Sequence, residues 1–183
     1  MTHEEKRLLL KAARNRIERY LGLTSEVVHL PAEGVFDTLS GCFVTLHAHG
    51  DLRGCIGFIK AVEPLRKTIE EAAILAATED PRFPPVKARD WPHVSIEISV
   101  LTPPFDMDNY DDIVVGKHGL IVREGMRSGL LLPQVPIEHG MNREEFLDAL
   151  CQKAGLPPKL WTQKQLKLQA FTAEVFSEEE HNG

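Results

Sequence analysis

Long hydrophobic runs are missing from this sequence, and cysteines are few. No apolar stretch approaches the roughly 20 residues of a membrane-spanning helix. The 3 cysteines among 183 residues form no CxxC pair. That spacing argues against a structural zinc site, and we expect free thiols in a reducing compartment. The first residues also lack the charged-then-apolar pattern of a signal peptide. We therefore expect a cytoplasmic protein with no membrane segment and no metal centre.

Positive charge is also scarce, since 21 Lys and Arg stand against 27 Asp and Glu. A net charge of −6 disfavours nucleic acid as a partner, because an interface with phosphates needs a basic surface. The sequence contains no Walker loop, GxGxxG, HExxH or GxSxG pattern, so it leaves any cofactor unknown. Its 43% apolar and 26% charged residues are typical of a globular protein.

The order of the predicted elements favours an α+β fold, with mostly antiparallel sheet and helices packed on it. We treat 1–183 as a single domain with an amphipathic helix over 2–21 and two lobes at 41–103 and 113–177. Each lobe reads strand, strand, helix, strand, which suggests a duplicated ββαβ unit. The alternative is that this common order arose by chance. Strands are expected at 42–48, 52–59, 94–101, 120–123, 130–135 and 168–176, and further helices from Pro64 and over 143–153.

The segment Leu52–Gly57, which reads LRGCIG, places a cation, a thiol and two glycines inside a predicted strand. Glycine weakens the interior of a strand, so Gly54 and Gly57 need a reason. That reason is a bulge, or the close approach of a ligand or of another backbone. We predict that both glycines belong to a binding site for a small molecule or a peptide.

Strand alternation sends Leu52, Ile56 and Phe58 to the core and places Arg53 and Cys55 on the opposite face. A neighbouring guanidinium stabilises a thiolate. Cys55 is therefore a candidate catalytic nucleophile, redox thiol or ligand contact, and Arg53 is a candidate substrate-binding residue. The alternative is a small buried cysteine beside an arginine that closes an ion pair.

Two charged residues elsewhere complete the predicted site. Glu97 lies in mid-strand between two serines, where it could pair with Arg53 or act as a catalytic proton acceptor. The commoner alternative is a solvated sheet face. Arg82 lies in a stiff, proline-rich loop, so it would lose little entropy on binding a carboxylate or phosphate. The alternative is a loop that anchors itself, with Phe83 in the core and Arg82 on Asp80.

Two other features favour structure over function. His47 and His49 have strand spacing on one face, but no third metal ligand is evident, so polar surface is the better interpretation. Cys151 has apolar helical neighbours and is predicted to lie in the core.

Taken together, these residues resemble the AMMECR1 domain family, whose hallmark is the run found here as Leu52–Gly57. The resemblance covers roughly Leu8 to Val175. Its other matching segments are Pro64-Leu65, Asp80-Pro81-Arg82-Phe83, Glu97-Ile98-Ser99-Val100-Leu101, Gly119-Leu120, Leu132-Pro133-Gln134-Val135-Pro136 and the helix that contains Glu144 and Cys151.

The resemblance implies a two-lobed α+β fold in which the hallmark segment lines a cleft between lobes. It also implies that this chain is the A component of the AmmeMemoRadiSam system, with a Memo-like protein and a radical-SAM protein as partners. No settled reaction comes with the family, so it stays open whether the chain is an enzyme.

Two functions compete. In the first, the chain belongs to a multi-protein modification system with a cleft site built around a reactive Cys55. In the second, it is a non-catalytic adaptor whose glycine-flanked strand docks a partner protein or peptide. A third function, nucleic-acid binding, is disfavoured because the sequence has no stripe of basic and aromatic residues.

Overall fold

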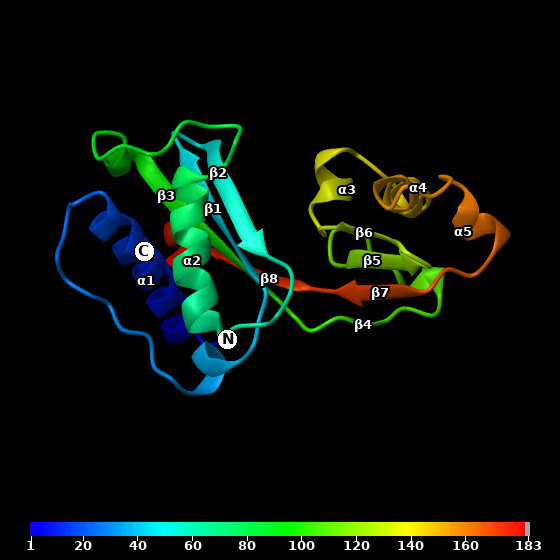
Figure 1. The fold of residues 1–183 in the computed structure, drawn as a ribbon, viewed down its shortest axis with the longest axis horizontal. Helices are drawn as coiled ribbons and strands as arrows, with labels where there is room; N and C mark the ends of the chain where they lie inside the picture. The colour runs from blue at the N-terminus through cyan, green and yellow to red at the C-terminus, as the bar shows by residue number, and fades with distance from the viewer. Residues whose placement is uncertain (182–183) are drawn as a thin grey trace. The chain divides into compact units, whose positions relative to one another are not determined.

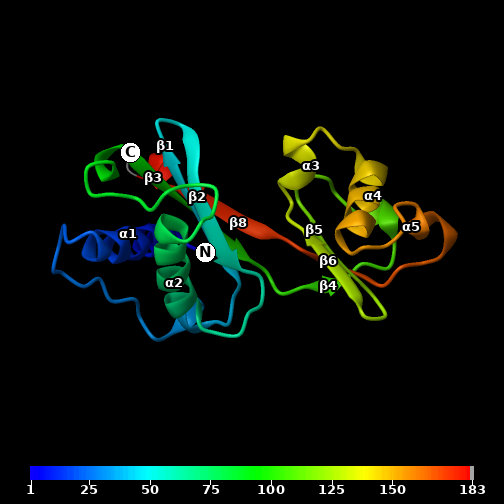
Figure 2. The same cartoon turned by 45° about the horizontal axis from the view of Figure 1, so that its top comes forward.

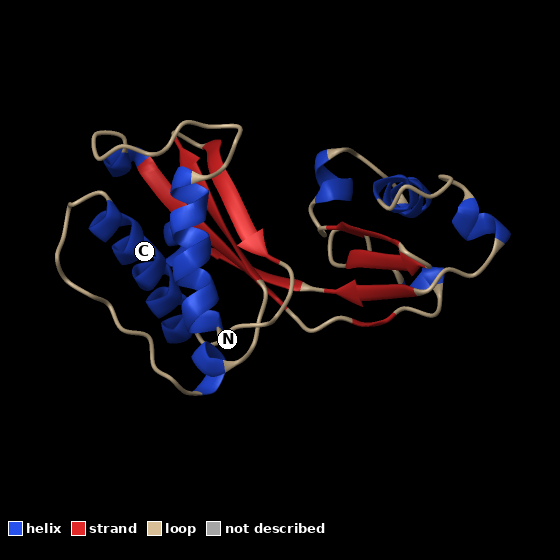
Figure 3. Ribbon diagram, in the orientation of Figure 1, coloured by secondary structure: helices blue, strands red, loops and turns tan. Residues whose placement is uncertain are grey.

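The computed structural model describes residues 1–181, which form two compact units of helices and antiparallel sheet (Figure 1). One unit comprises Met1–Leu101 and the chain from Glu174 onward, and the other comprises Thr102–Ala173. Each unit has a four-stranded sheet with helices beside it (Figure 3). The predicted α+β class is confirmed. No helix within residues 1–181 is long and apolar enough to cross a membrane.

The first unit packs two long helices against one face of its sheet. Its elements are α1 (His3–Tyr20), η1 (Gly34–Asp37), β1 (Cys42–Ala48), β2 (Asp51–Phe58), α2 (Leu65–Thr78), η2 (Trp91–His93), β3 (Val94–Leu101), β8 (Ala173–Ser177) and α6 (Glu178–His181). The strand order is β2-β1-β3-β8, so β2 is an edge strand. Figures 1 and 2 draw α1 and α2 on the same side of the sheet. Cys42, Val44 and Leu46 alternate along β1 and are fully buried on that side, as strand periodicity requires.

The helix α1 is held by polar contacts at its N-terminus and at its middle. Thr2 and Glu5 form a capping box, in which each side chain accepts a hydrogen bond from the other residue's backbone N–H. Further along, Arg14 donates to the buried carboxylate of Glu178, with Nη2 2.7 Å from Oε2. The same carboxylate accepts the Ile96 N–H of β3 at 2.8 Å. The segment after β8 is thereby joined to α1 and to the sheet.

The second unit has the same arrangement of helices beside a four-stranded sheet as the first unit, with shorter elements. They are β4 (Phe105–Asp106), η3 (Tyr110–Asp112), β5 (Gly119–Glu124), β6 (Arg127–Leu131), α3 (Val135–Glu138), α4 (Arg143–Lys153), α5 (Leu160–Gln163) and β7 (Leu168–Phe171). The strand order is β4-β7-β5-β6. Phe146, Leu147 and Leu150 of α4 form its core with Leu120 and Val122 of β5.

The strand orders of the two units match, which agrees with the predicted repeat. In each, the first strand of a hairpin is central, the second strand is at the edge, and the strand after the long helix pairs on the other side. If the chain is divided into the halves β1–β4 and β5–β8, each half gives its last strand to the other sheet: β4 follows β3 but pairs with β7, and β8 follows β7 but joins β3. A common origin of the halves stays a prediction.

Several boundaries differ from prediction by one to three residues, and two predicted strands differ by more. The strand expected over 168–176 is two strands, β7 and β8, which lie in different sheets. The strand expected over 130–135 ends at Leu131, and the following residues enter the short helix α3. The strands β1 and β3 and the helix α4 have the predicted bounds.

Candidate functional site

A β-bulge at Arg53 sets the geometry of the hallmark segment. The β1–β2 register pairs Leu46 with Gly54 but His47 with Leu52, so Arg53 is the extra residue. Because of the bulge, Leu52 lies on the face opposite to the one that alternation predicts. It is 39% exposed, and the prediction that it faces the core is wrong.

Three polar side chains form a row across the sheet face that α1 and α2 leave free. Cys55 of β2 pairs with Thr45 of β1, and Thr45 pairs with Glu97 of β3. Directly paired residues have Cβ atoms about 4.5–5.5 Å apart. Thr45 therefore lies between the thiol and the carboxylate, and Glu97 is one strand too far away to touch Cys55 directly. All three residues are half-buried.

Hydrogen bonds hold Cys55 at both its side chain and its backbone. The Thr45 hydroxyl donates to the Cys55 sulfur at 3.2 Å. The Cys55 N–H donates to Oδ2 of Asp80 at 2.9 Å. A carboxylate thus occupies a backbone donor that an edge strand would otherwise expose, which is one way of protecting a sheet edge.

Burial raises the pKa of the Cys55 thiol above its ordinary value, and the negative charges of Asp80 and Glu97 add to this effect. The Thr45 hydrogen bond and the positive charge of Arg82 act in the opposite direction. The sequence suggested that a cation beside Cys55 would favour the thiolate. In the structure that cation is Arg82, not Arg53, and it does not outweigh burial. The thiol is therefore protonated at neutral pH in the free protein.

Asp80 anchors the loop after α2. It is 4% exposed, and its oxygens accept the Arg82 backbone N–H at 3.1 Å and the Arg82 guanidinium at 3.0 and 2.8 Å. These bonds and the Cys55 N–H hold the pKa of the Asp80 carboxyl well below its usual range. The loop is thus anchored by Arg82 on Asp80, as one alternative predicted. The hydrophobic anchor is Val86, at 3% exposed, whereas Phe83 is only half-buried.

Phe83 brings the two predicted binding arginines together. The Arg53 guanidinium carbon lies 5.9 Å from the centroid of its ring and the Arg82 carbon 5.5 Å. Both distances are within the range of cation–π attraction. We refer to Cys55, Thr45, Glu97, Asp80 and Arg82 as the Cys55 site; Arg53 and Phe83 border it.

Close approach of neighbouring backbone explains both glycines of the hallmark segment. A Cβ atom at Gly54 would lie 2.2 Å from the Ala76 carbonyl oxygen of α2. A Cβ at Gly57 would lie 2.1 Å from the Cys42 carbonyl oxygen and 2.6 Å from Phe43. A contact of either glycine with a ligand stays a prediction.

Comparison with the second unit shows which residues of the Cys55 row the fold itself needs. Gly129 of β6 occupies the position that Gly54 has in β2, and its Cβ would lie 2.7 Å from the Ala154 backbone nitrogen beside α4. In the second unit, the row that corresponds to Cys55, Thr45 and Glu97 is Leu130, Ile121 and Gln169. This topology therefore requires a glycine at that position but no thiol, hydroxyl or carboxylate in the row.

The remaining candidates lie elsewhere. His49 is in the β1–β2 turn with a φ of 53° and stacks on His93 at 4.7 Å, so it does not share a strand face with His47. Cys42 and Cys151 are fully buried. Burial raises the pKa of Cys42 to about 12 and also raises the pKa of Cys151.

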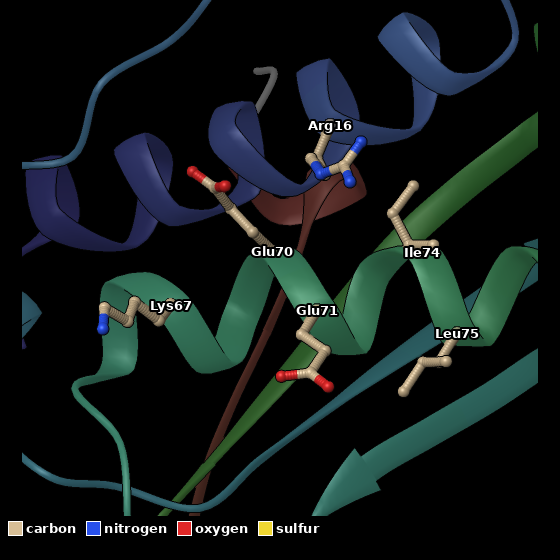
Figure 4. Close-up of a pocket in the computed structure, with 6 residues that line it drawn as sticks. All are labelled: Arg16, Lys67, Glu70, Glu71, Ile74 and Leu75. Carbon is tan, nitrogen blue, oxygen red and sulfur yellow. The ribbon is translucent and has the colours of Figure 1, made fainter.

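Two hollows elsewhere on the protein are lined by neither cysteine nor histidine. One of about 290 Å³ lies beside α1 and α2, with Arg16 from α1 and five residues from α2 (Figure 4). Glu70 and Ile74 extend towards α1, whereas Glu71 extends away from it (Figure 4). Its charged residues balance: two are basic and two are acidic. A second hollow, of about 200 Å³, surrounds Ile121 and Gln169 in the second unit.

Comparison with known proteins gives the family. The AMMECR1 family model matches residues 10–176. A protein of Methanocaldococcus jannaschii is 44% identical over 100% of this chain and 94% of its own length. A protein of Methanopyrus kandleri is 45% identical over 100% of this chain and 93% of its own length. The crystal structure of an uncharacterized protein from Pyrococcus horikoshii is 44% identical, covers 96% of this chain and 92% of that chain, and has a TM-score of 0.78. This chain therefore belongs to the AMMECR1 family.

Neither Thr45 nor Asp80 was among the predicted site residues. Thr45 was not singled out, although the predicted strands at 42–48 and 52–59 already place it opposite Cys55, as the structure does. Asp80 was noted as a partner of Arg82. Its bond to the Cys55 backbone depends on how the loop after α2 returns to the sheet edge, and no local pattern reveals that path.

Proposed function

We propose that this chain is a component of a multi-protein modification system, and that its Cys55 thiol reacts only when a ligand or a partner protein joins the Cys55 site. The observation that carries this proposal is the half-buried thiol fixed by Thr45 and Asp80, in a row that the second unit replaces with apolar and neutral residues. The fold does not need that row, so a function is the better reason for it.

Because the pKa of Cys55 is raised, we propose that its reaction depends on a ligand or a partner protein. Only a thiolate is a good nucleophile, and Cys55 is protonated in the free protein. A ligand or partner that excludes water would have to bring a base or a positive charge, or shield Asp80 and Glu97. In the free protein the Thr45 hydroxyl donates to the sulfur. If that hydroxyl turned to donate to Glu97, its oxygen would accept the thiol proton and its own proton would go to Glu97, which is the catalytic role predicted for Glu97. A Memo-like and a radical-SAM protein, implied by the family resemblance, are the proposed partners.

Reconstitution with these two proteins tests the proposal. We expect that both partners bind the wild-type chain and the Cys55→Ser variant equally. Only the wild type should acquire a covalent adduct on the Cys55 peptide, measured by mass spectrometry during turnover. Cys42→Ser is the matched control, because Cys42 is fully buried in the same sheet. If turnover proceeds equally with Cys55→Ser and no adduct forms, the thiol has no chemical role.

The adaptor function remains the second candidate, because β2 is an edge strand. Asp80 already occupies the Cys55 N–H, which blocks pairing at Cys55 itself, so we place strand addition on the part of β2 beyond it. The apolar residues that follow, Ile59 at 42% and Val62 at 71% exposed, suit such a contact. Val62→Glu should abolish partner binding if the chain is an adaptor, whereas substitution of Gly57 would clash with β1 and test only folding.

A further inference from the structure

We infer that Arg53, Phe83 and Arg82 form a binding site for an oxyanion, a carboxylate or phosphate group carried by the ligand whose other end reaches Cys55. This inference rests on the proposed function of the Cys55 site and names the chemical class of its ligand. It begins from the two guanidinium groups that share the Phe83 ring.

Arg53 is the unusual member of this group. It is half-buried, yet within residues 1–181 it forms no ion pair, and its one contact of note is with the Phe83 ring. No buried side-chain nitrogen in that part of the chain lacks a partner, so the Arg53 nitrogens reach solvent. A guanidinium that is held by a ring and a β-bulge, and has its donors free, loses little entropy on binding an oxyanion.

Arg82 supplies the second charge in a fixed orientation. Its Nε and Nη2 atoms bind Asp80 in a bidentate pair, which leaves Nη1 and one hydrogen of Nη2 for a ligand. Its side chain is 56% exposed. Because Asp80 also binds the Cys55 N–H, the outer edge of this guanidinium is held near the thiol.

The charges near the Phe83 ring favour an anion, although the chain as a whole is negatively charged. Near the Phe83 ring, Arg53 and Arg82 contribute two positive charges and Asp80 one negative charge. Glu97 adds a second negative charge, but it lies on the other side of Thr45 from Cys55, and the chain as a whole carries a net charge of −6. Anions approaching other parts of the surface are repelled on average, so a positive spot beside a thiol gives selectivity as well as affinity.

A comparison of two alkylating reagents tests the inference. Iodoacetate carries a carboxylate and iodoacetamide is neutral, and both alkylate a thiolate with loss of iodide. Their rate ratio at Cys55 therefore cancels the thiol pKa and reports the charge beside the sulfur. One net positive charge about 6 Å from the carboxylate of iodoacetate, in water-like surroundings, changes the ratio about threefold. We expect the iodoacetate-to-iodoacetamide ratio to be about threefold or more higher in the native protein than at Cys55 in urea-unfolded protein.

The test variant is Arg53→Gln, since Arg53 has no ion pair to lose. Arg82→Gln is unsuitable because it leaves the buried Asp80 without its cation. Arg53→Gln should bring the rate ratio down towards that of the unfolded chain. Arg89→Gln is the matched control, because Arg89 is exposed and contacts only Asp90 among the described ion pairs. A native ratio equal to the unfolded ratio, or one that Arg53→Gln leaves unchanged, overturns the inference.

A second measurement separates this inference from the proposed function. If Cys55 reacts with neither reagent, the reactive-thiol proposal fails, and inorganic phosphate then decides the oxyanion site. Calorimetric titration should show phosphate binding to the wild type and to Arg89→Gln, with at least a several-fold weaker affinity for Arg53→Gln. Equal phosphate affinity in the three proteins, or no binding at all, contradicts the inference whatever the thiol does.

Discussion

At the scale of single residues, the polar row on the open sheet face determines how Cys55 behaves. Thr45 lowers the pKa of Cys55 by donating a hydrogen bond to its sulfur, whereas the negative charge of Glu97 raises it. These opposite effects come from two neighbours on the same face, one of which touches the thiol. They allow a test in which two substitutions in one row give results of opposite sign.

We predict that Thr45→Val slows alkylation of Cys55 by iodoacetamide and that Glu97→Gln accelerates it at the same pH. Removal of the hydrogen bond disfavours the thiolate, and removal of the negative charge favours it. The measurement is the pH profile of the Cys55 rate by peptide mass spectrometry, which should shift up for Thr45→Val and down for Glu97→Gln. Shifts of the same sign would show that the row does not control the thiol in this way.

The hallmark glycines and the bulge give a second prediction at this scale. Gly54→Ala places a methyl group 2.2 Å from the Ala76 carbonyl oxygen and should lower the free energy of unfolding by about 1–3 kcal/mol. Leu52→Ala should cost less than about 1 kcal/mol, because the bulge leaves Leu52 39% exposed. Urea unfolding measures both. A Leu52→Ala cost of about 2–5 kcal/mol would mean that Leu52 is a core residue and that the bulge is misplaced.

At the scale of elements, the loop after α2 closes the free edge of β2. Asp80 binds the Cys55 N–H and the Arg82 guanidinium while almost fully buried, so a single carboxylate joins the loop, the strand and the predicted binding arginine. Asp80 therefore contributes to the stability of the hairpin as well as to the geometry of the site.

We predict that Asp80→Asn lowers the free energy of unfolding at pH 7 by about 1–3 kcal/mol. The folded-state pKa of Asp80 lies below its unfolded value of about 3.9. Its contribution is therefore present above about pH 4 and is lost as the pH falls towards the folded-state pKa. Urea unfolding at several pH values should show the wild type approaching Asp80→Asn in acid. Asp90→Asn, at a 43% exposed aspartate, is the control and should have little effect.

Elements with their own local signals were predicted well from the sequence. The strands β1 and β3 show strict alternation, and α4 begins with a capping box at Asn142 and Glu145. The errors occurred where another segment decides the outcome. The bulge at Arg53 depends on the pairing with β1, and the division of residues 168–176 depends on two different sheets. For the same reason the sequence marked Cys55, Glu97 and Arg82 as candidates but did not identify Asp80 as a neighbour of the thiol.

At the scale of the whole molecule, each sheet takes its fourth strand from the other half of the chain. The first unit therefore depends on residues that come last in the sequence: Phe176 is 1% exposed in its core, and Glu178 binds Arg14 and the backbone of β3. The unit that carries the Cys55 site is thus not a contiguous stretch of sequence.

We predict that a fragment of residues 1–101 does not fold stably by itself. Loss of Phe176 alone should cost about 3–5 kcal/mol, and loss of Glu178 leaves Arg14 without its main partner. A fragment in which a flexible linker joins 1–101 to 174–183 restores both and should fold. Circular dichroism and thermal unfolding distinguish the two. Equal stability of the two fragments would contradict the exchange of strands between the halves.

The most direct measurement is the alkylation of the three cysteines in the native protein, followed site by site with iodoacetamide at pH 8. Cys55 should react measurably but more slowly than a free thiol, because the residue is only half-buried and its pKa is raised. The fully buried Cys42 and Cys151 should stay unmodified until the protein unfolds. Protection of Cys55 to the same degree as Cys42 would contradict the claim that the hallmark segment presents its thiol to a ligand.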